Sequence, residues 1–277
     1  MTTTSRQTLP LEIWLKILKL VPDPSTLNQL AKSSRQIYAI AQCSLYRHFG
    51  HLALRWAAER GCYRTAIMSL TLSAANINER DSQGQTPLYW AAQGGHTNIV
   101  RLLLGMGEWE ETMPVIAPIQ TNYTSEQYQA MQKEVAMQIL PNLGNYRKVT
   151  PILIATLQGH ANVVKLLLSN HRLNPNAKDD RGYPALMSAI FAEHTPIIKL
   201  LLADTRVDPN SGNGLSTILC NAVEEGREEV VRMLVENKRV DLDMMDCMGN
   251  SPLDIARRSQ HMALVKLLVI AKEKRPN

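Results

Sequence analysis

The chain has 277 residues, 20% of them charged, and a formal net charge of +5 at pH 7. Its lysines and arginines are interleaved with acidic residues and form no long basic run, so we expect no direct binding to nucleic acid. No apolar run reaches the length of a membrane span, and the first residues lack the apolar centre of a signal peptide, so we expect no membrane association.

The four cysteines are scattered along the chain without a CxxC pair, at Cys43, Cys62, Cys220 and Cys247. This pattern favours reduced thiols over disulfides, and reduced thiols are typical of cytoplasmic and nuclear proteins. We therefore expect the protein in the cytoplasm, the nucleus or both.

Residues 1–8 are predicted to be a disordered N-terminus, and residues 9–48 a separate helical segment that begins "LPLEIWLKILKLVPDPSTLNQLAKSSRQIYAIA". Its apolar residues recur at helical spacing, and "PDPS" breaks the first helix. This segment resembles an F-box. The residues that carry the resemblance are Leu9-Pro10, Glu12-Ile13, Ile17-Leu18, Leu27, Ser34-Arg35 and Tyr38.

The F-box resemblance implies a docking partner, the small linker subunit of a cullin-type ubiquitin ligase. The residues implied to contact it are Leu9, Pro10, Ile13, Ile17 and Leu27. A second interpretation is that the same helices fold back and cap the repeats that follow, because the end of a repeat array must be covered. Both interpretations can hold together, since a helix has two faces.

The rest of the chain repeats one phrase, "TPLYWAAQGGHTNIVRLLL", which begins at Thr86. Copies begin at Thr150, Pro184, Thr217 and Ser251, the last three at spacings of 34, 33 and 34 residues, and a degenerate copy begins at Leu52. Each phrase predicts a first helix with a narrow alanine-containing face, a glycine turn and a second helix rich in leucine. Neither helix alone can bury its apolar face, so we expect the units to stack.

The period and the phrase resemble ankyrin repeats. The resemblance implies an all-α solenoid of about six helix-turn-helix units with β-turn fingers between them, preceded by the small F-box-like segment. In this layout, repeats 1–2 occupy 51–107, an insertion occupies 108–144, repeats 3–6 occupy 145–271, and a polar tail occupies 272–277.

Two features depart from the regular repeat. The insertion contains "TSEQYQAMQKEVAMQIL", which predicts one helix with a capping box at Thr124 and Gln127. That helix either covers neighbouring repeats or carries a contact of its own. In addition, Lys148 and Leu215 stand where the other fingers have glycine, so we expect the third and fifth fingers to be irregular.

The sequence shows no recognisable catalytic set, no glycine-rich phosphate loop before a helix and no converging metal ligands, so we expect a non-enzymatic protein without a cofactor. Four histidines occupy the same position of successive units, at His96, His160, His194 and His261. Equivalent positions lie roughly 10 Å apart, too far to share a metal ion. We expect a ring nitrogen at this position to hydrogen-bond backbone groups of a turn.

In ankyrin-repeat proteins, the finger tips and the exposed ends of the first helices form a concave surface that binds protein partners. Carried over onto this sequence, the candidate partner-binding residues are Gln83, Gln85, Tyr146, Arg147, Arg181, Tyr183, Phe191, Met248 and Asn250. The middle of this surface is expected to contribute most, because aromatic residues and arginine dominate many interfaces. For Phe191, a contact to the neighbouring unit is an equal alternative.

Two functions agree with this sequence. The first is a substrate adaptor, in which the repeats hold a protein partner while residues 9–48 dock to the cullin-type ligase. The second is an ankyrin scaffold or a transcriptional co-regulator whose N-terminal helices only cap the array. Sequences of this layout resemble proteins of filamentous fungi, some of them co-regulators of secondary-metabolite pathways. We expect a monomer in either case.

Overall fold

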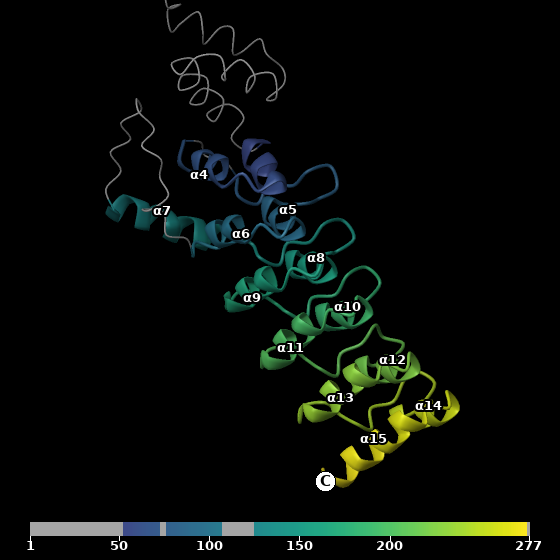
Figure 1. The fold of residues 1–277 in the computed structure, drawn as a ribbon. Coiled ribbons are helices and arrows are strands. Elements are labelled where there is room, and N and C mark those ends of the chain that lie inside the picture. The colour runs from purple at the N-terminus through teal and green to yellow at the C-terminus, as the bar shows by residue number, and fades with distance from the viewer. Residues whose placement is uncertain (1–51, 73–75, 107–124, 276–277) are drawn as a thin grey trace, which may run out of the picture. The chain divides into compact units, whose positions relative to one another are not determined.

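The computed structural model describes residues 52–72, 76–106 and 125–275, and the elements in these ranges are all helices, without a β-strand (Figure 1). Within this part of the chain, the prediction of an all-α repeat fold is confirmed. Several predictions lie outside the described residues. They concern the disordered N-terminus, the F-box-like segment with Leu9, Pro10, Ile13, Ile17 and Leu27, and Thr124 of the capping box.

The described residues divide into two compact units. Unit 1 contains the described residues up to Glu79 together with Arg101–Ile139, and unit 2 contains Arg80–Val100 and the residues from Leu140 onward. All nine candidate partner-binding residues belong to unit 2.

Unit 1 includes the insertion helix. Its elements are a helix over 52–60, α4 (Tyr63–Leu72) and α7 (Ser125–Gln138). Helix α7 passes so close to Gly105 that a Cβ added there would lie 2.5 Å from the Cβ of Ala136. The insertion helix therefore packs against its own unit, and the missing side chain of Gly105 allows this approach.

Unit 2 is a stack of helix pairs, each with an inner helix followed by an outer helix. The inner helices are α5 (Pro87–Gln93), α8 (Pro151–Leu157), α10 (Ala185–Phe191), α12 (Ile218–Glu224) and α14 (Pro252–Arg258). The outer helices are α6 (Thr97–Leu103), whose last turn belongs to unit 1, α9 (Ala161–Ser169), α11 (Thr195–Ala203), α13 (Glu228–Glu236) and α15 (Met262–Glu273). Successive inner helices pack on one another from α5 to α14, and α9 packs on α11 and α13 on α15 (Figure 1).

The sequence sets the starts and the packing of the inner helices. Thr86, Thr217 and Ser251 each accept a hydrogen bond from the backbone N–H three residues further on. A cap of this kind stabilises a helix by about 1 kcal/mol. An alanine in each inner helix, such as Ala155 or Ala189, is completely buried, and this small side chain allows neighbouring helices to approach closely.

The turn that ends an inner helix also contacts the next repeat of unit 2. Three turn glycines have a positive φ, and a Cβ added to any of them would lie 2.7–2.9 Å from a histidine ring of the next repeat. The pairs are Gly95 with His160, Gly159 with His194, and Gly226 with His261. Each ring donates from Nε2 to the carbonyl of the last residue of the inner helix in the preceding repeat. The distance from Nε2 of His160 to the carbonyl oxygen of Gln93 is 2.9 Å. These three histidines thus bond backbone groups, as predicted, and the groups belong to the preceding repeat.

One junction uses a glutamate and an arginine in place of glycine and histidine. Glu193 stands in the glycine position with a φ of 58°, and Arg227 stands in the histidine position. The Nη1 of Arg227 lies 2.9 Å from the carbonyl oxygen of Ile190 and 2.9 Å from the Glu193 carboxylate. Both kinds of pair therefore hydrogen-bond an inner helix to the next repeat, through different side chains.

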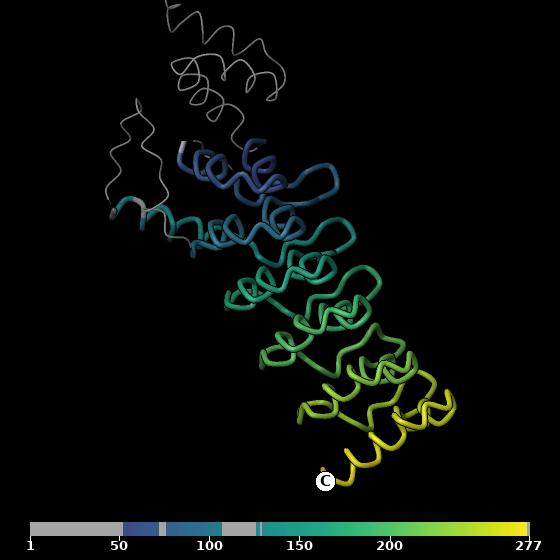
Figure 2. The backbone as a smooth tube through the Cα atoms, viewed as in Figure 1, coloured from purple at the N-terminus to yellow at the C-terminus, as the bar shows by residue number. Residues whose placement is uncertain are grey.

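Each finger is a tight turn held by the side chain of the residue directly before its tip. The Oδ1 atoms of four such residues accept two backbone N–H groups of the tip: Asp81, Asn145, Asp179 and Asp246. Backbone hydrogen bonds also join neighbouring tips, from Tyr146 to Gln83, from Asp180 to Arg147 and from Cys247 to Leu215, with N···O distances of 3.2, 2.9 and 2.8 Å. The fingers follow one another on the same side of unit 2 (Figure 2).

The third finger is regular, contrary to the prediction from its missing glycine. Lys148 adopts the left-handed backbone, with a φ of 58°, as Gly84 does at 75°. The two backbone bonds to Asn145 hold this conformation despite its steric cost. The fifth finger is irregular, as predicted: it is one residue shorter, and Gly214 takes the left-handed conformation before Leu215.

We expect Lys148→Gly to raise the free energy of unfolding by about 1 kcal/mol, because glycine removes the steric cost of a side chain at positive φ. Lys148→Ala keeps a Cβ and is the matched control, so its stability should stay near that of the wild type. Urea denaturation followed by circular dichroism measures both variants. Equal stability of the glycine and alanine variants would contradict this explanation.

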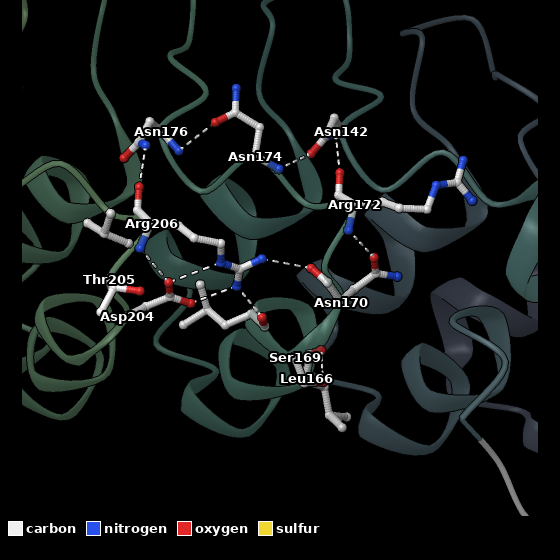
Figure 3. Close-up of polar contacts among 12 residues, drawn as sticks. Asn142, Leu166, Ser169, Asn170, Arg172, Asn174, Asn176, Asp204, Thr205 and Arg206 are labelled. Atoms are coloured by element: carbon white, nitrogen blue, oxygen red, sulfur yellow. Dashed lines mark hydrogen bonds and ion pairs between the residues drawn. The ribbon is translucent and has the colours of Figure 1, made fainter.

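Asparagine side chains link the loops that follow the outer helices. Asn142 donates from Nδ2 to the carbonyl of Arg172 at 2.8 Å and accepts from the backbone N–H of Asn174 at 2.7 Å (Figure 3). Asn176 and Asn210, each 34 residues further along the chain, make the same two bonds to the next loop. These bonds hold the loops of successive repeats together.

Arginine side chains cap the outer helices across the same junctions. Arg206 donates to the carbonyl oxygens of Leu168 and Asn170, at the end of α9, and hydrogen-bonds both carboxylate oxygens of Asp204 (Figure 3). Arg239 and Arg275 donate in the same way to carbonyls at the ends of α11 and α13. The last carbonyls of a helix have no partner within it. Each arginine therefore stabilises the outer helix of the preceding repeat and joins two successive repeats.

Candidate functional site

The candidate residues lie on one surface of unit 2, which we call the finger face. It consists of the finger tips, residues 82–85, 146–149, 180–183, 214–216 and 247–250, and of the last residue of each inner helix. These last residues are Gln93, Leu157, Phe191, Glu224 and Arg258. Both sets recur once per unit, so equivalent side chains lie roughly 10 Å apart, which is the spacing of packed helices.

The centre of the helix-end row is apolar and exposed. Leu157 is 44% exposed and Phe191 37%, whereas the flanking positions of the row are polar or charged. The rings of Tyr183 and Phe191 meet edge to face, with centroids 5.5 Å apart and an interplanar angle of 84°. The ring contact of Phe191 is thus with the finger of its own unit. An apolar centre with a polar rim is the usual arrangement of an interface hot spot.

The tips of the third and fourth fingers carry basic residues. The Nε of Arg147 lies 3.3 Å from the Asp180 carboxylate of the next finger, and both side chains are largely exposed. An exposed ion pair of this kind contributes about 0–1 kcal/mol, so a partner can displace it at little cost. Lys148 and Arg181 are exposed and form no ion pair with any residue that the structure describes.

Three more of the predicted residues are exposed on the finger face: Gln83, Tyr146 and Met248. The ring of Tyr146 is accessible although the guanidinium carbon of Arg80 lies 5.5 Å from its centroid. A cation over an aromatic ring limits the motion of both side chains. Tyr146 is therefore a partly pre-ordered contact residue.

The two remaining predicted residues hold the fingers in place. The Nδ2 of Asn250 hydrogen-bonds both carboxylate oxygens of Asp246, and these bonds lower the pKa of Asp246. Gln85 hydrogen-bonds the hydroxyl of Tyr89, although burial dominates and raises the pKa of that hydroxyl. Both side chains are half-buried, so their structural contacts compete with contacts to a partner.

Several exposed residues of the finger face were missing from the predicted set, among them Leu157, Leu215 and Lys148. The last two show why they were missed. Leu215 is 65% exposed at the tip of the fifth finger, and Lys148 is exposed at the tip of the third. Sequence reasoning treated both as defects of a glycine turn. A large side chain in the glycine position of a turn is itself a signal of exposure, because a tight turn has no interior in which to bury it.

The described residues offer little for catalysis or metal binding. Nowhere in these ranges do three or more histidine, cysteine, aspartate or glutamate side chains gather in a way that could hold a metal ion. None of the described helices is long and apolar enough to cross a bilayer. The finger face presents aromatic and aliphatic side chains, with basic groups at the tips of the third and fourth fingers.

We expect iodoacetamide at neutral pH to modify Cys247 at least about tenfold faster than Cys220, because burial raises the pKa of the Cys220 thiol while Cys247 is exposed. Peptide mass spectrometry of the alkylated native protein measures the two rates. In concentrated urea both thiols should react alike, which is the control. Equal rates in the native protein would contradict the burial of Cys220.

Curated relatives match only part of the chain. Ankyrin repeat domain-containing protein 49 of Homo sapiens is 41% identical over 54 residues, which is 20% of this chain and 23% of that protein. The Bos taurus protein of the same name gives the same figures. The chain thus spans about a quarter of the length of the curated relatives it matches.

Solved structures match over most of the chain. The ankyrin repeat domain of Bcl-3, a member of the IκB protein family, has a TM-score of 0.64 at 20% identity, over 79% of this chain and 86% of that chain. An ankyrin repeat domain from Acinetobacter baumannii has a TM-score of 0.59 at 21% identity, over 79% and 96%. A chain from the Bdellovibrio bacteriovorus complex of a predatory endopeptidase with an immunity protein has a TM-score of 0.57 at 20% identity, over 79% and 98%. These structures share the fold.

Family models described as ankyrin repeats match residues 54–104, 127–213 and 205–277, which is more than half of the chain. Ankyrin repeats are protein–protein interaction domains, and the fold is typically a non-catalytic scaffold. The matched residues contain the helix pairs and the fingers described above. This chain belongs to the ankyrin-repeat family.

Proposed function

We propose that this chain is a non-catalytic adaptor whose finger face recruits a protein partner. The observation that carries the proposal is the exposed apolar centre formed by Leu157 and Phe191, between polar positions of the same row. Complete burial of such a side chain contributes about 1.5–3 kcal/mol. Because Leu157 and Phe191 are 44% and 37% exposed, burying what remains of both contributes roughly 1–2.5 kcal/mol.

The proposal is tested by capturing bound proteins from the cells that express the chain and quantifying them by mass spectrometry. The test variant is Leu157→Ser/Phe191→Ser. The matched control is Lys165→Ser/Lys199→Ser, which changes two exposed residues of the outer helices α9 and α11. Circular dichroism and urea denaturation check that all three proteins are folded.

We expect the wild type and the control to capture the same small set of proteins, and the finger-face variant to lose one or more of them. Loss of binding follows because serine removes the apolar area at the centre of the interface. If the folded finger-face variant captures the same set at the same level as the wild type, the finger face is not the recruiting surface.

At a finer level, we propose that the adaptor serves a cullin-type ubiquitin ligase, with residues 9–48 docked to the linker subunit. The support is the sequence pattern of Leu9, Pro10, Ile13, Ile17 and Leu27. A partly exposed apolar helix face is what partner docking needs.

Titration of the purified chain with the purified linker subunit tests this part of the proposal. The variant Ile13→Asp/Ile17→Asp should stay folded and lose binding, and Leu157→Ser/Phe191→Ser should bind as the wild type does. If the wild type does not bind the linker subunit, the ligase role is wrong. The chain would then be a scaffold or co-regulator whose N-terminal helices only cap the array.

A further inference from the structure

We propose that the finger face takes an extended acidic segment of its partner, with acidic residues against the third and fourth fingers and large apolar side chains against Leu157 and Phe191. This inference rests on the proposed function, because it names the chemistry of the segment that the same face would hold. It follows from the distribution of charge on the fingers, the state of the acids in the helix-end row, and the spacing of the repeats.

Basic residues are most frequent on two of the five fingers of unit 2, and the net positive charge lies on one of them, the third. The third finger, residues 144–149, contains Arg147 and Lys148 and no acid, and the fourth, residues 178–183, contains two basic and two acidic residues. The third finger thus carries a net charge of +2 and the fourth a net charge of 0. The same windows in the flanking fingers, 80–85, 212–216 and 245–250, carry net charges of 0, 0 and −1. The basic fingers are also those nearest in sequence to the apolar centre, since they precede α8 and α10.

The basic groups of these two fingers are largely available to a partner. Lys148 and Arg181 make no ion pair among the described residues, and the Arg147–Asp180 pair is solvent-exposed. One acid of the fourth finger, Asp179, is already engaged, because its carboxylate accepts two backbone N–H groups of its own turn. An acidic segment therefore meets Lys148 and Arg181 without an ion-pair partner and Arg147 in an exposed pair, whereas Lys178 already donates to the carbonyl of Gly212.

The acid of the helix-end row, Glu224, and two acids of the turns beside it are paired with arginines. Arg227 lies 2.9 Å from Glu193 and also pairs with Glu225, and Arg258 lies 3.7 Å from Glu224. These pairs weaken the repulsion that unpaired carboxylates would exert on an acidic segment. They also reduce the attraction for a basic segment, which is the alternative occupant.

The repeat spacing gives the segment a register. Arg147 and Arg181 occupy equivalent positions of adjacent fingers, and Leu157 and Phe191 occupy equivalent positions of adjacent inner helices. Equivalent positions lie roughly 10 Å apart, and an extended chain advances about 3.3 Å per residue. The partner segment should therefore present two acidic residues about three positions apart and two large apolar residues about three positions apart.

The test is a random 12-residue peptide library displayed on phage and selected on the full-length chain. Selected peptides are then synthesised and titrated by fluorescence anisotropy. We expect enrichment of Asp and Glu together with large apolar residues in the spacing given above. Raising NaCl from about 50 to about 500 mM should weaken binding severalfold, because exposed charges are screened.

Charge reversal supplies the matched comparison. Arg147→Glu/Arg181→Glu should weaken binding of the selected peptides by at least about tenfold, since like charges replace attractive ones. Lys165→Glu/Lys199→Glu changes net charge equally on the outer helices and should leave affinity within about twofold.

The outcomes separate this inference from the proposed function. Three outcomes would overturn the inference. The selected peptides are not enriched in acidic residues, the pool shows no enrichment at all, or acidic peptides bind the Arg147→Glu/Arg181→Glu variant as tightly as the wild type. Neutral or basic peptides that still lose binding to Leu157→Ser/Phe191→Ser would overturn the inference alone and leave the finger face as the recruiting surface. Peptides indifferent to every finger-face variant would contradict both.

Discussion

Replacing Arg206 with methionine is expected to lower the free energy of unfolding by about 3 kcal/mol. The Arg206 guanidinium donates to two carbonyl oxygens at the end of α9 and to both carboxylate oxygens of Asp204. Methionine keeps much of the apolar stem and removes all of these donors. The variant therefore leaves part-buried acceptors without a donor in two successive repeats. Urea denaturation followed by circular dichroism measures the loss.

Lys199→Met is the control, because Lys199 is an exposed residue of the outer helix α11 and the change removes a positive charge without removing a helix cap. Its stability should stay within about 0.5 kcal/mol of the wild type. A loss for Arg206→Met no larger than that for Lys199→Met would show that the arginine caps contribute nothing to the stack.

The stability deficit of Arg206→Met should also depend on pH. The hydrogen bond from Arg206 lowers the pKa of Asp204, so the folded-state pKa lies below the unfolded one. The corresponding stability is present above the unfolded pKa and is lost as pH falls through the folded pKa. The difference between wild type and variant should therefore shrink below about pH 4 without vanishing, since the bonds to α9 remain. A deficit that is constant from neutral to acid pH would exclude the contribution of Asp204.

Gly159→Glu is expected to destabilise the protein by about 3 kcal/mol. The backbone of Gly159 has a φ of +78°, and an added Cβ would lie 2.9 Å from Cε1 of His194. The side chain must therefore adopt an unfavourable backbone conformation and push the His194 ring away from the carbonyl of Leu157, to which Nε2 bonds. Thermal and urea denaturation measure the change.

Adding His194→Arg to Gly159→Glu should recover about 1 kcal/mol or more of this loss. The reason is that Glu193 and Arg227 already form such a pair one unit further on, with the glutamate at positive φ. His194→Arg alone has no glutamate opposite it and should not stabilise the wild type. If the double variant is no more stable than Gly159→Glu, the two junction types are not interchangeable, and the pairing rule is wrong.

The repeat register, and with it the position of the finger face, could be predicted from the sequence. Period and phrase fix which residues end each inner helix and which form each tip, so Leu157 and Phe191 fall in one row without any coordinates. The regular geometry of the third finger could not be predicted in this way. It depends on whether the Asn145 side chain can hold Lys148 at positive φ, and that balance is a matter of about 1–2 kcal/mol.

The arginine caps and asparagine links were absent from the sequence analysis although their signal is periodic. The sequences "NHR", "DTR" and "NKR" recur at Asn170, Asp204 and Asn237, and Asn142, Asn176 and Asn210 are spaced by 34 residues. A search confined to apolar residues, glycine and histidine does not detect polar side chains that act between units. Pairings such as Arg147 with Asp180 need coordinates as well, because long side chains can choose among several partners within reach.

The most direct test of the central claim, that the finger face recruits a protein, is photo-crosslinking in the cells that express the chain. The photoreactive residue p-benzoylphenylalanine replaces Phe191 on the finger face or, as the control, Lys199 on the outer helix α11. We predict discrete crosslinked protein adducts from position 191 that are absent from position 199. No adduct from position 191, or the same adducts from both positions, would contradict the claim.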